Sequence, residues 1–137
     1  MRKLLGTVLA MTLALSGAAA AEVLKCTMKV GRSNQGDMIS KEVYLIHDPA
    51  AKSMMVLDNI IAHYNKEKPI EARITTEKPA SRKFDWAVHM VNDAGQRTRM
   101  QYHASLFLAT SELHVMARPV GYSNTISATG KCAPHNG

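Results

Sequence analysis

The sequence predicts an all-β protein built as a small antiparallel β-barrel of about eight strands, with a β-sandwich as the alternative. Three observations support this prediction. Apolar and polar residues alternate with a period of two along most of the chain. The alternating segments are short and are separated by clusters of glycine, proline, asparagine and aspartate. Two cysteines, Cys26 and Cys132, lie far apart in the sequence, and a bond between them would join the first and last strands.

Residues 1–21 are expected to be a signal peptide that takes no part in the fold. Arg2 and Lys3 form a basic start, Leu4 to Leu15 is an apolar run, and four alanines then offer a cleavage site. Cleavage leaves residues 22–137 as a single domain. We therefore expect a periplasmic or secreted protein, and the sequence contains no other segment apolar enough to predict a transmembrane helix.

The distribution of charge argues against a nucleic-acid partner. Without Arg2 and Lys3, the 17 basic residues fall to 15 against 11 acidic ones, a formal charge of +4. These basic residues are scattered, whereas nucleic-acid-binding proteins concentrate basic charge on one stripe with aromatic residues between. The mildly basic charge could favour an acidic partner or an anionic envelope surface, and an effect on solubility alone would explain it equally well. The sequence predicts no oligomeric state.

The first predicted strand covers Val23 to Val30, because its apolar residues fall on one face. The glycine- and asparagine-containing segment 31–37 is predicted to be a loop. A second strand over 41–48 and a third over 53–58 are joined by a proline turn at Asp48 to Lys52.

The middle of the chain is less regular. Residues 60–65 are predicted to form a short strand or sheet edge, or a short helix around Asn59 to Tyr64. Ile70 to Thr76 alternates cleanly again and is predicted to be a strand, followed by a loop over 77–82.

A β-hairpin is the strongest local prediction, with one strand over Phe84 to Met90 and the next over Met100 to Leu106. A loop at Asp93 to Gly95 would place the glycine where a left-handed residue is needed. The predicted register places the apolar residues of both strands on one side. It pairs Trp86 with Tyr102, Val88 with Met100, Phe84 with Ala104, Asp85 with His103, and His89 with Arg99.

The last two predicted strands cover 111–118 and 125–132, with a loop over 119–124 between them. Cys26 and Cys132 both fall on the apolar faces of their strands, so the disulfide should be buried. It would close a loop of roughly 105 residues, which the chain-entropy model values at about 4–5 kcal/mol. Pairing of the first strand with the last favours a closed barrel of the lipocalin-like kind, since closure removes exposed strand edges.

The chain resembles a loose group of small exported β proteins of Gram-negative bacteria. The resemblance rests on the opening cysteine strand LKCTMKV, the strand and turn YLIHDPAAKSM, and the ending LFLATSELHVMARPVGYSNTISATGKC. This resemblance implies export and a β fold. The group has no assigned activity, so no functional residue follows from it.

A soft-metal site is one hypothesis for the histidines and methionines. Ten residues separate His89 from Met100, and His114 and Met116 form an H-x-M motif, a spacing similar to that of cupredoxin-like periplasmic copper chaperones. Thirteen residues separate Met100 from His114, which is shorter than in that family. The hairpin register also puts His89 and Met100 on opposite faces, so these methionines are equally explained as core residues.

Catalysis is not expected. His103 opposite Asp85 would make a base with an orienting carboxylate, and Ser105 lies two residues further along the same strand. The sequence contains no G-x-S-x-G and no H-E-x-x-H motif, and cross-strand Asp–His pairs are common on sheet surfaces. An unrecognised hydrolase is kept only as an alternative, and no cofactor is expected.

Small barrels either are filled by side chains or hold one small ligand. Trp86, Tyr102 and Met28 are the candidate ligand contacts, and the mouth of a pocket would be bordered by the loops 31–37, 77–82 and 119–124. The sequence therefore predicts an exported protein with a non-catalytic binding or structural role in the cell envelope. Its partner would be a small apolar ligand or an envelope protein, and copper or zinc binding is the alternative.

Overall fold

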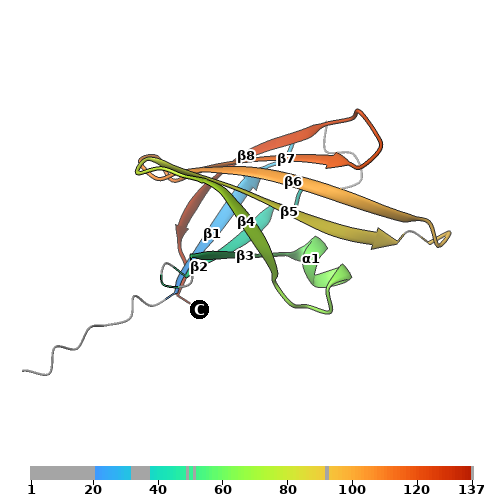
Figure 1. The fold of residues 1–137 in the computed structure, drawn as a ribbon, viewed down its shortest axis with the longest axis horizontal. Coiled ribbons are helices and arrows are strands. Elements are labelled where there is room, and N and C mark those ends of the chain that lie inside the picture. The colour runs from blue at the N-terminus through green and yellow to red at the C-terminus, as the bar shows by residue number, and fades with distance from the viewer. Residues whose placement is uncertain (1–20, 32–37, 49, 51, 92, 137) are drawn as a thin grey trace, which may run out of the picture.

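The protein is a closed antiparallel β-barrel of eight strands (Figure 1). The structure, a computed structural model, describes residues 21–31, 38–48, 50, 52–91 and 93–136. The elements are β1 (Glu22–Lys29), β2 (Glu42–Asp48), β3 (Ser53–Asp58), α1 (Asn59–Tyr64), β4 (Ile70–Glu77), β5 (Ser81–Val91), β6 (Arg97–Phe107), β7 (Glu112–Pro119) and β8 (Ile126–Pro134). Each strand pairs with the next, and β8 pairs with β1. The predicted fold class is confirmed, and the sandwich alternative is wrong.

The disulfide joins the two strands that close the barrel. Cys26 stands directly opposite Cys132 in the register of β1 and β8, and the two residues are bonded through their Sγ atoms. Both are buried in the core, as expected from their position on the apolar faces. Within the described residues, every strand of the closed barrel pairs with a neighbour on both sides, so no whole strand forms a free edge.

The β5–β6 hairpin has the register that the sequence predicts. Trp86 lies opposite Tyr102 and Asp85 lies opposite His103. Gly95 has a φ of 76°, the left-handed conformation that the turn requires and that glycine adopts without strain. The matching apolar faces of the two strands fix this pairing, because a slip of one residue would expose them.

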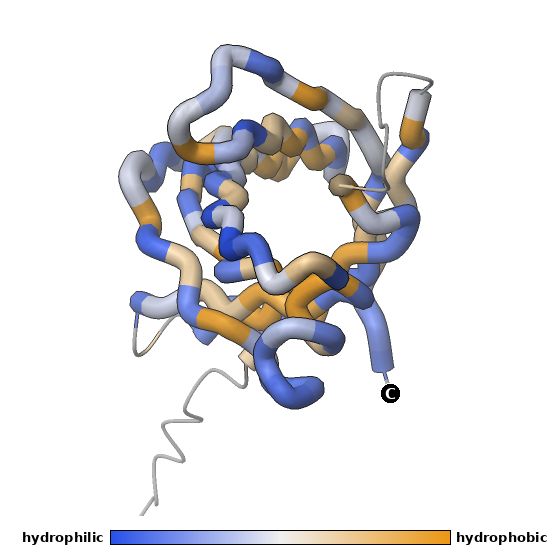
Figure 2. Tube along the Cα trace, turned by 90° about the vertical axis from the view of Figure 1, so that its right-hand side faces the viewer, coloured by the Kyte–Doolittle hydropathy of each residue, from blue (hydrophilic) through white to orange (hydrophobic). Residues whose placement is uncertain are grey.

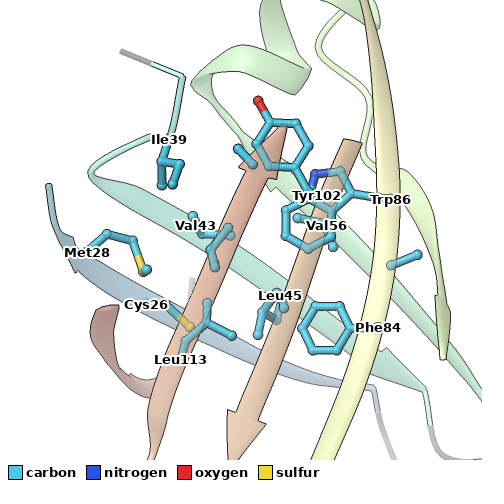
Figure 3. Packing of buried hydrophobic residues seen from close by; sticks show 14 of the residues in the cluster. Cys26, Met28, Ile39, Val43, Leu45, Val56, Phe84, Trp86, Tyr102 and Leu113 are labelled. Carbon is cyan, nitrogen blue, oxygen red and sulfur yellow. The ribbon is translucent and has the colours of Figure 1, made fainter. Parts of the chain in front are cut away.

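Inward-facing side chains fill the barrel (Figure 3). Trp86 stacks on Tyr102 with ring centroids 5.1 Å apart and an interplanar angle of 4°, and Phe84 packs on Trp86 at 5.8 Å. We call these three residues the aromatic stack. Such ring pairs stabilise a fold by about 0.5–1.5 kcal/mol beyond the area they bury.

Residues 59–64 form a helix, so the alternative of a strand over 60–65 is wrong. Asp58 caps this helix, because its Oδ1 accepts a hydrogen bond of 2.8 Å from the backbone N–H of Ile61. Ile61 is fully buried and anchors the helix to the barrel. Within the described residues, no helix has the length and hydropathy needed to cross a membrane.

The barrel has two different ends. We call one the mouth end, formed by the described parts of segment 30–41, by α1 and segment 65–69, by the β5–β6 turn, and by loop 120–125. It is on the right of Figure 1, where α1 and the tip of the β5–β6 hairpin lie. The opposite end, which we call the terminal end, holds the start of β1, the end of β8 and the β4–β5 and β6–β7 turns.

Candidate functional site

Two adjoining hollows open at the mouth end. One has a volume of about 430 Å³ and the other about 410 Å³. Met38, Tyr64 and Met90 line both of them, so the two hollows adjoin at the end of the barrel. We call the pair of hollows the mouth site. Each hollow is within the range of about 300–1,000 Å³ that small-molecule sites occupy.

The walls of the mouth site come from four segments that are distant in sequence. The first hollow is lined by residues of segment 38–41 and by one face of α1, including Ile60 and His63. The second is lined by the ends of β5, β6 and β7 and by Tyr122. Three methionines contribute, since Met100 lines the second hollow beside the shared Met38 and Met90. Methionine is unbranched and polarisable, so such walls adapt to ligands of different shape.

Buried polar groups lie directly beneath the mouth site. The Tyr102 hydroxyl donates a hydrogen bond of 2.7 Å to the carbonyl oxygen of Met38, and burial raises the pKa of this phenol. Burial also raises the pKa of Asp58, although the backbone N–H groups of Ile61 and Ile60 oppose the shift. The indole Nε1 of Trp86 is buried and has no hydrogen-bond partner among the described residues. These polar groups do not line the hollows, but they fix the packed interior on which the hollows rest.

The predicted ligand contacts lie deeper than the mouth site. Trp86, Tyr102 and Met28 are all buried in the packed interior, and none of them lines either hollow. Figure 3 shows Trp86 and Tyr102 filling the barrel side by side, with Met28 on the opposite wall. Their role as ligand contacts stays a prediction, and it would require the aromatic stack to separate.

Only part of the predicted rim surrounds the mouth site. Loop 119–124 contributes Pro119, Tyr122 and Asn124. Residues 32–37, which make up most of the predicted rim loop over 31–37, lie outside the described residues. The turn over 77–82 was expected at the same rim, but it joins β4 to β5 at the terminal end. Local patterns locate a turn without showing which end of the barrel it occupies.

The residues proposed for soft metal are divided between the two faces of the barrel wall. Met100 is buried inside, whereas His89, His114 and Met116 are exposed outside. Among the described residues, no group of three or more His, Cys, Asp or Glu side chains is arranged to hold a metal ion. The arrangement therefore offers no observation in favour of the copper or zinc alternative.

The Asp85–His103 pair forms on the outer wall, as the hairpin register predicts. His103 Nδ1 lies 2.7 Å from Asp85 Oδ1, and Arg73 Nη2 lies 3.9 Å from Asp85 Oδ2. Ser105 is opposite Lys83 on one side and His114 on the other, in both cases away from His103. The pair resembles a cross-strand surface interaction, which contributes fractions of a kcal/mol to a sheet.

A second, smaller cavity of about 160 Å³ lies at the terminal end, and it contains the group that sequence reasoning missed. His47 is buried there, and Arg82 Nη1 lies 3.2 Å from its Nδ1. An arginine can only donate, so Nδ1 accepts and the ring proton is on Nε2, which has no partner among the described residues. Burial first, and Arg82 second, lower the pKa of His47. The alternation of Val43, Leu45 and His47 in β2 was the available signal for its inward orientation.

No family model matches this sequence, and comparisons with curated proteins and with solved structures find no match.

Proposed function

We propose that this chain is an exported binding protein of the cell envelope that takes a small, mostly apolar ligand at the mouth site and performs no catalysis. The observation that carries the proposal is that the two hollows adjoin and share the lining residues Met38, Tyr64 and Met90. A ligand that lies over these three residues would contact apolar side chains of both hollows. Lys41, Asn59 and His63 line the first hollow and offer polar contacts for one end of it.

The fold supports binding at the end of the barrel. The aromatic stack and its neighbours fill the interior beneath the mouth end, so the free space at this end lies between the loops and α1. A filled barrel also gives the site a rigid base, because the Tyr102 hydroxyl ties Met38 to β6. A site that is already formed loses less entropy when it binds a ligand than one that must first become ordered.

The disulfide supports the expected compartment. Cys26 and Cys132 form a disulfide. Disulfides persist in the periplasm or outside the cell and are rare in the reducing cytosol. Together with the signal-like pattern of residues 1–21, this bond favours export to the envelope.

The proposal is tested with N-phenyl-1-naphthylamine, an uncharged apolar probe whose fluorescence rises in an apolar site. Met90→Lys places a charge in both hollows, and Met116→Lys places the same charge on the exposed outer wall. We expect saturable binding to the wild-type protein and to Met116→Lys, and a loss of at least tenfold in affinity for Met90→Lys, since one buried charge opposes apolar contact.

Equal binding by the two lysine variants would show that the probe sits elsewhere. The absence of saturable probe binding to the wild-type protein would overturn the proposal. Circular dichroism of each variant verifies that the barrel is folded, so a loss of binding is not confused with a loss of structure.

A further inference from the structure

The mouth end is the most apolar part of the exposed surface. Six large apolar side chains are exposed among the described residues, and four of them belong to this end. The four are Tyr64, Val91, Val120 and Tyr122, with exposed fractions of 37%, 49%, 48% and 64%. Tyr64 and Tyr122 line the same hollow, and the backbone N–H of Val120 donates to the carbonyl oxygen of Arg99 at the start of β6. Val91 lies opposite Arg97 in the β5–β6 register, so all four residues belong to the same end of the barrel.

Basic side chains surround these apolar residues. Arg97 and Arg99 lie at the start of β6 and Arg118 near the end of β7, all exposed on the outer wall. Four lysines of the same end are also exposed, namely Lys29, Lys41, Lys66 and Lys68. The described part of the chain gives none of these seven residues an ion pair with a carboxylate.

The acidic residues do not balance this charge. Glu67, Glu71 and Asp93 are the exposed carboxylates at this end that lack an ion pair within the described residues, against seven unpaired basic side chains. Glu42, at the start of β2, is already paired with Lys25 at 3.5 Å. Seven basic side chains without an ion pair, against three such carboxylates, leave the mouth end with an excess of exposed positive charge.

The terminal end provides a contrast within the same molecule. There Arg82 Nε lies 3.5 Å from a Glu77 oxygen, and Lys131 Nζ lies 3.7 Å from a Glu112 oxygen. Leu108 is the only large apolar residue exposed in its described turns. Lys52, Lys78 and Lys83 at the terminal end also have no ion pair within the described residues, so the exposed apolar side chains beside the basic ones are what distinguish the mouth end. Figure 2 views the molecule along the barrel towards the mouth end, with hydrophilic and hydrophobic segments interleaved around the rim.

We propose that the mouth end docks on an anionic lipid surface. Tyrosine side chains favour the boundary between lipid headgroups and hydrocarbon, because their rings are apolar and their hydroxyls are polar. The arginine and lysine side chains around them attract negatively charged headgroups. The binding free energy of each basic residue adds to that of the buried apolar side chains. An acidic protein would satisfy the charge, but it would not require apolar side chains exposed on α1, at the end of β5 and in loop 120–125.

This docking does not depend on the proposed ligand. If both are correct, the mouth site opens directly onto the lipid, which would be the source or destination of an apolar ligand. Either one can fail alone, because N-phenyl-1-naphthylamine binding is measured without lipid and docking is measured without the probe.

Docking is tested by sedimentation with vesicles of phosphatidylcholine alone or mixed with phosphatidylglycerol. The test variant is Arg97→Gln/Arg99→Gln/Arg118→Gln, and the charge-matched control is Lys52→Gln/Lys78→Gln/Lys83→Gln at the terminal end. Every protein carries the same N-terminal segment, so a difference between the two triple variants reports the mouth end.

We expect the wild-type protein and the lysine control to sediment with phosphatidylglycerol vesicles, and less so as ionic strength rises. The arginine variant should bind about fivefold more weakly for each arginine removed. Val120→Ser/Tyr122→Ser should also weaken binding, with the salt dependence retained. Equal binding to vesicles with and without phosphatidylglycerol, an equal loss in both triple variants, or no binding by the wild-type protein would each overturn the proposal.

Discussion

The hydroxyl of Tyr102, on β6, donates a hydrogen bond of 2.7 Å to the backbone carbonyl oxygen of Met38, 64 residues away in the sequence. Tyr102 belongs to the aromatic stack, whereas Met38 lines both hollows of the mouth site. One contact therefore joins the packed interior to the wall of the proposed binding site. Burial raises the pKa of Tyr102, so its hydroxyl keeps the donor proton.

Tyr102→Phe should lower the free energy of unfolding by about 0.5–1.5 kcal/mol, because the ring still packs while the carbonyl oxygen of Met38 loses its donor. Urea unfolding followed by tryptophan fluorescence measures this change. Tyr122→Phe removes the same hydroxyl from an exposed loop residue and should leave stability unchanged. Equal effects of the two substitutions would contradict the assigned role of Tyr102.

Gly130→Ala should destabilise the barrel by about 1–3 kcal/mol through overpacking. A Cβ at Gly130 would overlap the backbone carbonyl oxygen of Thr27 and come within 2.6 Å of Met28 Sδ, so β1 and β8 would have to move apart. Thr129→Ala, on the outer face of the same strand, is the matched control and should change stability by less than about 0.5 kcal/mol. If Gly130→Ala unfolds at the wild-type urea concentration, the close approach of these strands is wrong.

His47 should make the protein less stable in mild acid. Its folded-state pKa is lowered from 6.5, so between that value and the lowered pKa the unfolded chain binds a proton that the folded protein excludes. The stability that neutral His47 contributes is present above pH 6.5 and is lost as pH falls, by at most about 1.4 kcal/mol per pH unit.

The measurement is urea unfolding of the wild-type protein and of His47→Gln between pH 7 and about pH 5. The difference in unfolding free energy between them should shrink or reverse towards acid. Arg82, Glu77, Glu22 and Asp48 all act on His47, so an NMR titration of its ring gives the pKa directly. A measured pKa at or above 6.5 would rule out this explanation of acid sensitivity.

Asp58 should reveal the separate contributions of helix capping and of charge. Asp58→Ala removes the acceptor of the Ile61 N–H and should cost about 1 kcal/mol, whereas Asp58→Asn keeps an acceptor. Burial raises the folded-state pKa of Asp58 above 3.8, so the wild-type protein loses stability as pH rises through that window. The free energy of unfolding of Asp58→Asn should therefore rise relative to that of the wild-type protein as pH increases above 3.8, and urea unfolding measures this difference. A constant difference between the two would contradict the raised pKa.

The hairpin register and the disulfide could be predicted because their causes are local or few. Asp93 to Gly95 provides a turn that only one alignment of the flanking apolar residues satisfies, and Cys26 has a single possible partner. Strand closure then follows, since β1 and β8 hold the two cysteines opposite each other.

The mouth site could not be predicted in this way. Its lining combines Met38, Tyr64, Met90 and Tyr122, which come from four segments and meet only because the barrel closes. The sequence around Trp86 would be the same whether its side chain contacted a ligand or filled the core. In the structure Trp86 belongs to the aromatic stack. Alternation gives the face on which a side chain lies, but not what lies opposite it across the barrel.

The bond between Cys26 and Cys132 turns the intervening chain into a covalent ring that contains nearly the whole barrel. A tensile force applied to the two ends of the protein would pass through the sulfur atoms instead of through the strands. Only the residues outside the ring could extend, and the pairing of Glu22 to Lys25 with β2 is a part of the sheet that would resist the force. A protease that cut one loop inside the ring would likewise release no fragment, because both halves would stay joined at the bridge.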